Sequence, residues 1–112
     1  MGIAANQSRL MTITARMHDL ELRAQQISAQ KIQMSMESES IATTYANALN
    51  AGNGESAKAT YDKAVAKLST AEKALDLELT QINTEHTAVT TEYDSIKSLI
   101  KDNTDKSFSL FG

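Results

Sequence analysis

Apolar residues recur along this chain at steps of three and four residues, and this spacing is the feature that most constrains its fold. From Ile3 to Ala48, fourteen positions follow the pattern and eleven of them are apolar. A mean step of about 3.5 residues places such positions on one narrow stripe of a helix, the seam of a left-handed coiled coil. A β-strand has a side-chain period of two and does not produce this spacing. The sequence therefore predicts a long helix over about residues 3–50.

The same spacing returns in the second half of the chain. From Tyr61 to Ile100, ten of twelve positions are apolar or aromatic. This pattern predicts a second helix over about residues 56–107, followed by an apolar C-terminal end at 108–112. We expect the two helices to pack along their seams. The seam residues are Leu10, Ile13, Met17, Leu20, Ile27, Met34, Ile41, Tyr45, Tyr61, Val65, Leu68, Leu75, Leu79, Ile82, Val89, Tyr93, Ile96 and Ile100.

The stretch between the two patterns contains two of the four glycines in a chain without proline, Gly52 and Gly54. Glycine readily adopts positive φ at a helix C-cap, and Glu55 or Ser56 is suited to starting the next helix. A turn at about residues 51–55 would let the two helices fold back on each other. The predicted fold is all-α, a single long antiparallel two-helix coiled-coil hairpin over residues 1–112.

Further apolar residues lie off the two seams, where a lone hairpin leaves them exposed. At a rise of about 1.5 Å per residue each arm would be roughly 70 Å long, and one seam buries little of that surface. We expect the off-seam residues to contact helices of other copies or of a different protein. The alternative is an apolar exposed face without a partner. This predicted assembly surface comprises Met11, Leu22, Ile32, Met36, Leu77, Leu99, Phe108, Leu110 and Phe111.

Polar residues within the seams have structural interpretations. Lys31 and Glu72 fall near each other if the hairpin closes at residues 50–54, and such a pair would fix the register at some cost in stability. His86 would face the region around Leu20 and His18, which suggests a pH-sensitive interface or a metal site. Two histidines without clustered thiolates or carboxylates supply too few ligands for zinc, so packing is the favoured interpretation and no metal site is predicted.

No pattern in the sequence indicates catalysis or a cofactor. The many Ser and Thr residues are spread along helices without a base in reach, and Gly52 and Gly54 lack the lysine and strand of a phosphate-binding loop. A net charge of −3 without basic blocks argues against nucleic-acid binding. Cysteine is absent, which excludes disulfides and thiolate metal sites. We predict a non-enzymatic protein without cofactors.

The ends of the chain bear on its location. No basic segment at the N-terminus leads into an apolar run, so a cleavable secretory signal is not expected. No apolar segment approaches the ~20 residues that a membrane-spanning helix needs. Abundant Ser, Thr, Ala, Asn and Gln, with few aromatic residues, describe a chain that gains order by lateral helix packing. Such a chain is suited to export in an unfolded state.

In this architecture the chain resembles the axial proteins of bacterial flagella and type III secretion needles or filaments. The residues behind the resemblance are the opening Ala5–Thr12 (ANQSRLMT) and the ending Ser107–Gly112 (SFSLFG), which are similar to flagellin termini. The resemblance implies a homo-oligomeric structural subunit of an extracellular or cell-surface filament. It also implies passage through export machinery, with or without a chaperone, and without a cleavable signal.

Two other functions stay open. The small secreted hairpins of type VII systems have a similar length, but their Trp-x-Gly turn is absent. Their Tyr-x-x-x-acid motif is absent too, since Val65 and Lys97 stand four residues after Tyr61 and Tyr93. A cytoplasmic coiled-coil adaptor or chaperone, whose hairpin grips a different protein, is the other alternative.

Overall fold

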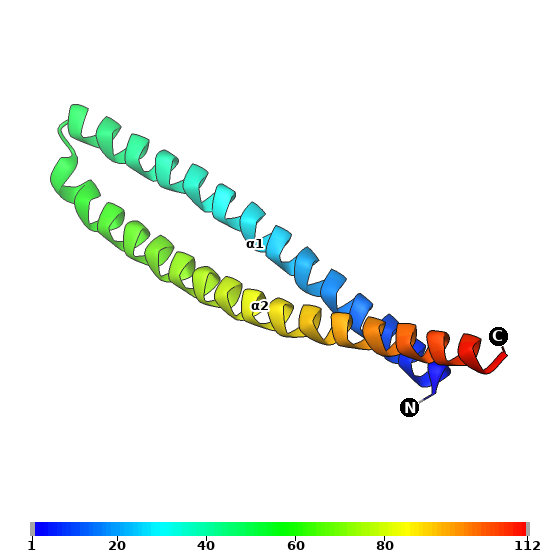
Figure 1. Ribbon diagram of the computed structural model, residues 1–112. Helices are drawn as coiled ribbons and strands as arrows, with labels where there is room; N and C mark the ends of the chain where they lie inside the picture. The colour runs from blue at the N-terminus through cyan, green and yellow to red at the C-terminus, as the bar shows by residue number, and fades with distance from the viewer. Residues whose placement is uncertain (1, 112) are drawn as a thin grey trace. The chain divides into compact units, whose positions relative to one another are not determined.

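The computed structural model describes residues 2–111, with side chains over residues 2–109, and consists of two α-helices (Figure 1). Helix α1 spans Ile3–Asn50 and helix α2 spans Gly54–Phe111. The described residues contain no β-strand. The predicted all-α helical hairpin is confirmed.

The chain forms two compact units, each containing a stretch of both helices. The terminal unit consists of the residues up to Ala24 together with those from Gln81 onward, and the turn unit consists of Gln25–Thr80. The sequence predicts one hairpin domain from its length of 112 residues, and the heptad spacing continues across the boundary between the two units. The composition of the seam differs between the units, however, and so does their packing.

The turn that reverses the chain is built on glycine at the end of α1. Gly52 has a φ of +83°, and it is the one described residue with positive φ. The Gly52 amide donates to the Leu49 carbonyl at 3.1 Å, and the Asn53 amide donates to the Ala48 carbonyl at 2.8 Å. These two bonds form a Schellman motif, which satisfies carbonyls that the helix end would otherwise leave unpaired. Positive φ costs an L-residue energy, so glycine is needed here.

Helix α2 begins at Gly54, with Asn53 at its N-cap, earlier than the predicted start at Glu55 or Ser56. The Asn53 carbonyl accepts the first bond of the helix, from the Ala57 amide at 3.0 Å, and also accepts a bond from the Ser56 hydroxyl at 3.1 Å. Asparagine is among the most favoured N-cap residues. Glu55 then lies in the first turn, where its charge complements the helix dipole. At its other end α2 continues to Phe111, past the predicted limit at 107, since the sequence there contains neither Pro nor Gly until residue 112.

The terminal unit has a core of β-branched residues from both helices. Ile13 on α1 and Val89 and Ile96 on α2 are buried against one another. Such residues pack well in a heptad seam, where each side chain inserts between residues of the facing helix. Partly buried residues surround this cluster, namely Leu10, Met17, Leu20, Tyr93 and Ile100.

The turn unit is packed less completely. Ile27 is fully buried, and it is the one described apolar residue of this unit that is. Near the turn, the rings of Tyr45 and Tyr61 stack with centroids 4.5 Å apart and an interplanar angle of 23°, a favourable aromatic geometry. Between Ile27 and this stack the seam is open, and Val65 is 42% exposed.

Candidate assembly surface

Most of the predicted seam residues lie at least partly out of water. Of the eighteen, seventeen are buried or partly buried, and Val65 is exposed. Val65 faces a hollow of about 310 Å³ that also borders Ser38 and Glu72. These two polar seam positions are themselves exposed, so a small and a charged side chain border the hollow where apolar residues would fill the seam.

Ion pairs fix the register along one flank of the terminal unit. Arg9 Nη2 donates to Glu92 Oε1 at 3.5 Å, and Arg16 Nη2 lies 3.5 Å from Glu85 Oε2. The two arginines are seven residues apart, and so are the two glutamates, so both pairs occupy equivalent heptad positions. All four side chains are more than a third exposed, so each pair is worth about 0.2–1 kcal/mol.

Sequence reasoning missed these pairs, although the sequence contains a signal for them. The three arginines of the chain are Arg9, Arg16 and Arg23, all at heptad steps. Glutamates follow the same step on the second helix at 78, 85 and 92. In antiparallel coiled coils such flanking positions face one another and select the partner and its orientation.

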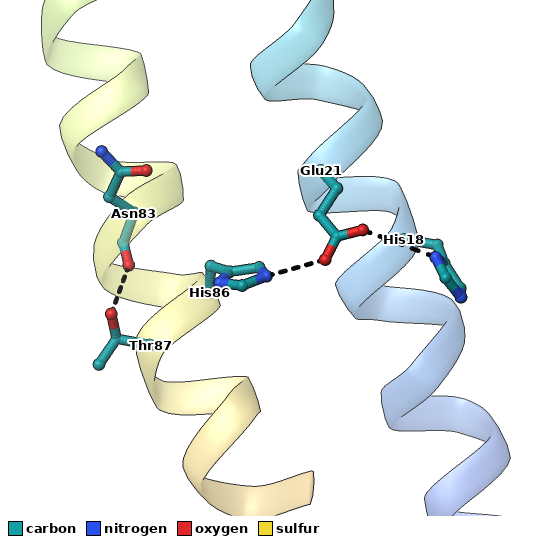
Figure 2. Close-up of polar contacts among 5 residues, drawn as sticks. All are labelled: His18, Glu21, Asn83, His86 and Thr87. Carbon is teal, nitrogen blue, oxygen red and sulfur yellow. Dashed lines mark hydrogen bonds and ion pairs between the residues drawn. The ribbon is translucent and has the colours of Figure 1, made fainter.

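On another flank, Glu21 lies between two imidazoles (Figure 2). Its Oε1 is 3.2 Å from His86 Nε2 across the hairpin, and its Oε2 is 3.7 Å from His18 Nδ1 on the same helix. The sequence predicted that His86 faces the region around Leu20 and His18. It did not predict that the Glu21 carboxylate lies between the two histidines. The described residues form no group of three or more His, Cys, Asp or Glu side chains that could hold a metal ion.

Lys31 and Glu72 lie near each other as expected, since both border the 310 Å³ hollow. The ion pair itself forms with a different carboxylate, because Lys31 Nζ donates to Asp76 Oδ1 at 2.5 Å. Asp76 lies one helical turn after Glu72, and the long lysine stem reaches this half-exposed carboxylate, which stays hydrated. The hydrogen bond and charge of Asp76 raise the pKa of Lys31 above 10.5, and the charge of Glu72 adds a smaller effect in the same direction. Glu72 is therefore close enough to act on the lysine through its charge.

The predicted off-seam residues are exposed wherever the structure describes their side chains. In the terminal unit the exposed residues are Met11, Leu22, Leu99 and Phe108, and Met11 is 74% exposed. The turn unit carries Ile32, Met36 and Leu77. The side chains of Leu110 and Phe111 lie outside the described residues. Two further apolar residues are exposed, namely Leu49 and Ile3, the first position of the heptad pattern.

Both units also have hollows on their surface. In the turn unit, the 310 Å³ hollow has a neighbour of about 280 Å³, and the two share Ile41 and Tyr61 at the seam. In the terminal unit, a shallow hollow of about 400 Å³ lies on α1 beside the exposed Met11. The 280 Å³ and 400 Å³ hollows have mainly apolar walls and offer places for further helices, whereas the 310 Å³ hollow is also bordered by Lys31 and Glu72.

Comparisons of this chain with protein families, curated proteins and solved structures found no match. Within residues 2–111, neither helix contains a stretch long and apolar enough to cross a membrane. The arrangement of side chains described above is thus the basis for any statement about function.

Proposed function

We propose that this chain is a structural subunit that assembles with copies of itself, through lateral contacts between helices, into a filament. The observation that carries the proposal is the set of apolar side chains left exposed off the seam on both units, among them Met11 and Phe108 at 74% and 73% exposure. Single exposed apolar residues are common on proteins. Here they recur along helices that already bury their own seam, so they are available to neighbouring subunits.

The hairpin's own contacts support a subunit that is formed before it assembles. Ion pairs across the terminal unit hold its two helices in one register. Threonine hydroxyls along both helices donate to carbonyls of their own helix, as Thr44 does to Ser40 and Thr87 to Asn83. These side chains therefore need no partner from another molecule, and apolar contact is left as the main driving force for assembly.

The resemblance to flagellar and type III axial proteins extends the proposal to an exported, extracellular bacterial filament. In this function the chain contributes surfaces and mechanical continuity, and no chemistry at a catalytic site. A coiled-coil adaptor for a different protein is the competing function, and it differs in the size of the assembly that the pure chain reaches.

The test is the size distribution of the purified protein as its concentration rises. Sedimentation velocity and negative-stain electron microscopy should show small species giving way to long polymers. Assembly that ends at a dimer or tetramer at every concentration would reject the filament and favour the adaptor. Replacing Phe108 by Ser should raise the concentration needed for assembly, whereas replacing the exposed Lys106 by Ser should leave it unchanged.

A further inference from the structure

Helix α1 has a second regular stripe on its outward side, distinct from its seam. In the terminal unit this outer stripe consists of Ala4, Ser8, Met11, Ala15, His18 and Leu22, at alternating steps of four and three residues. All six residues are exposed. None of them is Asp, Glu, Lys or Arg. A helix with two stripes of heptad spacing can pack against two partners at once, and α2 covers only the seam.

The shape and chemistry around the outer stripe favour contact with another helix. The 400 Å³ hollow on α1 is lined by Met11, Ala15 and His18 from the stripe and by Leu10 and Thr14 beside it. Leu10 also packs against the core of the terminal unit. A helix seated in this hollow would therefore extend the existing core continuously.

Two threonines beside the stripe can be buried at little cost. The Thr14 hydroxyl donates to the Leu10 carbonyl at 2.7 Å, and the Thr12 hydroxyl donates to the Ser8 carbonyl at 3.2 Å. A hydroxyl that already has its bond presents mainly its methyl group to a neighbour. Covering it does not leave an unpaired donor, which is the expensive outcome of burying polar groups.

Charge decides which face fits against the outer stripe. Burying an unpaired charge is costly, so an uncharged stripe is complemented by another uncharged surface. The outward side of α2 in the terminal unit carries Asp94, Lys97 and Lys101 around a shallow depression. The α1 stripe of a second copy carries no such charges. Of these two surfaces, the α1 stripe is therefore the complementary one.

Size complementarity gives the direction and register. The outer stripe contains three small residues and three large ones, and the small ones lie mainly toward the N-terminus. If two copies lie antiparallel and are related by a two-fold axis near residue 13, every large residue meets a small one. Large-on-small pairing lets facing helices interdigitate without voids. The facing pairs in this register are Met11 with Ala15, His18 with Ser8 and Leu22 with Ala4.

We propose that the outer stripe of α1 binds the same stripe of a second copy in this antiparallel register. The inference rests on the proposed self-assembly and names one of its contacts. A stripe of 19 residues is roughly 28 Å long and 10 Å wide, or about 300 Å² per partner. A stable interface buries about 800 Å² per partner, so this contact is weak alone and gains strength by repetition in an assembly.

The experiment replaces Ala15 by Glu and, as the matched control, the exposed Ala88 of α2 by Glu. Both changes add the same charge to an exposed alanine of the terminal unit. Helix content and unfolding midpoint of each variant are measured first, to show that both fold. By sedimentation, the Ala15→Glu variant should need at least roughly tenfold more protein to associate, because its carboxylate would be buried against the second copy. The Ala88→Glu variant should associate like the unchanged protein.

Cysteine cross-linking tests the register, and the chain's lack of native cysteine makes it clean. Copies carrying Met11→Cys mixed with copies carrying Ala15→Cys should form disulfide dimers faster than either variant alone. Equal rates in the three samples would overturn the antiparallel register. Association of Ala15→Glu at the concentration of the unchanged protein would overturn the stripe while leaving self-assembly standing. If the unchanged protein stays monomeric at every concentration, both the stripe and the proposed function are rejected.

Discussion

The terminal unit and the turn unit share one heptad spacing but reach different packing. In the terminal unit the seam places Ile13, Val89 and Ile96 in contact and removes them from water. In the turn unit the seam residue Lys31 forms an ion pair with Asp76, and the seam beside it is open. Regular spacing therefore determines which residues face the partner helix. Whether they close a core depends on the size and polarity of the residue at each position.

The better-packed unit also has a defect. The side-chain oxygens of Asn6 and Thr90 are buried there without a hydrogen-bond partner among the described residues. An unpaired buried polar atom costs about 1–3 kcal/mol, comparable to the gain from burying one aliphatic side chain. The terminal unit is therefore better packed because of its apolar residues. Its two buried, unpaired oxygens reduce the stability that this packing provides.

The largest expected effect contrasts one core residue from each unit. Ile96 is 1% exposed, so Ile96→Ala should lower the free energy of unfolding by about 2–5 kcal/mol. Leu68 is only partly buried beside the open seam, and Leu68→Ala should cost about 1 kcal/mol. Urea unfolding of the two variants measures both values. Equal losses would remove the distinction between the units.

The next effect concerns the turn. Gly52→Ala should lose about 1–2 kcal/mol, because alanine is strained at a φ of +83°. Gly54→Ala is the control. Its new methyl group would meet Leu49 Cδ2 at 2.5 Å, but Leu49 is half-exposed and can move. We expect a change near zero for Gly54→Ala by thermal unfolding. A Gly52→Ala variant as stable as the unchanged protein contradicts a strained turn.

Filling the open seam should make the turn unit more like the terminal unit. Ser38 occupies a seam position and borders the 310 Å³ hollow. Ser38→Leu should therefore raise the free energy of unfolding by about 1 kcal/mol, part of the value of a fully buried leucine. Ser28→Leu, at an exposed position off the seam, should have no such effect. If both variants gain equally, general hydrophobicity is responsible and the hollow is not.

Charge reversal tests the flank of the terminal unit. Arg16→Glu should cost about 0.2–1 kcal/mol, because it removes the pair with Glu85 and places two like charges together. The double variant Arg16→Glu with Glu85→Arg should recover most of the loss. The loss should also shrink in high salt, which screens exposed charges. Denaturant unfolding at two salt concentrations is the measurement, and a double variant as unstable as the single one would exclude a direct pair.

The smallest effect is a titration in the turn unit. Asp76 raises the pKa of Lys31 above 10.5, so Asp76→Asn should lower it toward that value, and Glu72→Gln should lower it less. A raised lysine pKa stabilises the fold at every pH below 10.5, and this contribution is lost as the pH rises through the raised value. NMR titration of the lysine side chain gives the order of the two carboxylates. A larger effect of Glu72→Gln would reverse our assignment of the partner.

The seam could be predicted from sequence because residue spacing fixes helical faces directly. Other features needed coordinates for physical reasons. Lys31 can reach either Glu72 or Asp76 from one helical position, and only the path of its flexible stem chooses between them. By residue type, Asn53 is as favourable a helix start as Glu55 or Ser56. The backbone shows that it is the N-cap, because its amide bonds back to α1 and its carbonyl accepts the first bond of α2. The openness near Val65 depends on how far the side chains around Ser38 and Glu72 fill the space beside it, which spacing does not encode.

The tyrosines give the two units separate optical signatures. The chain has three tyrosines and no tryptophan. Two of them stack on each other near the reversal of the chain, whereas Tyr93 lies under the ammonium group of Lys97 in the other unit. Near-ultraviolet dichroism from the stacked pair and fluorescence from a Tyr45→Phe, Tyr61→Phe background can therefore follow each half of the hairpin melting independently, without an introduced label.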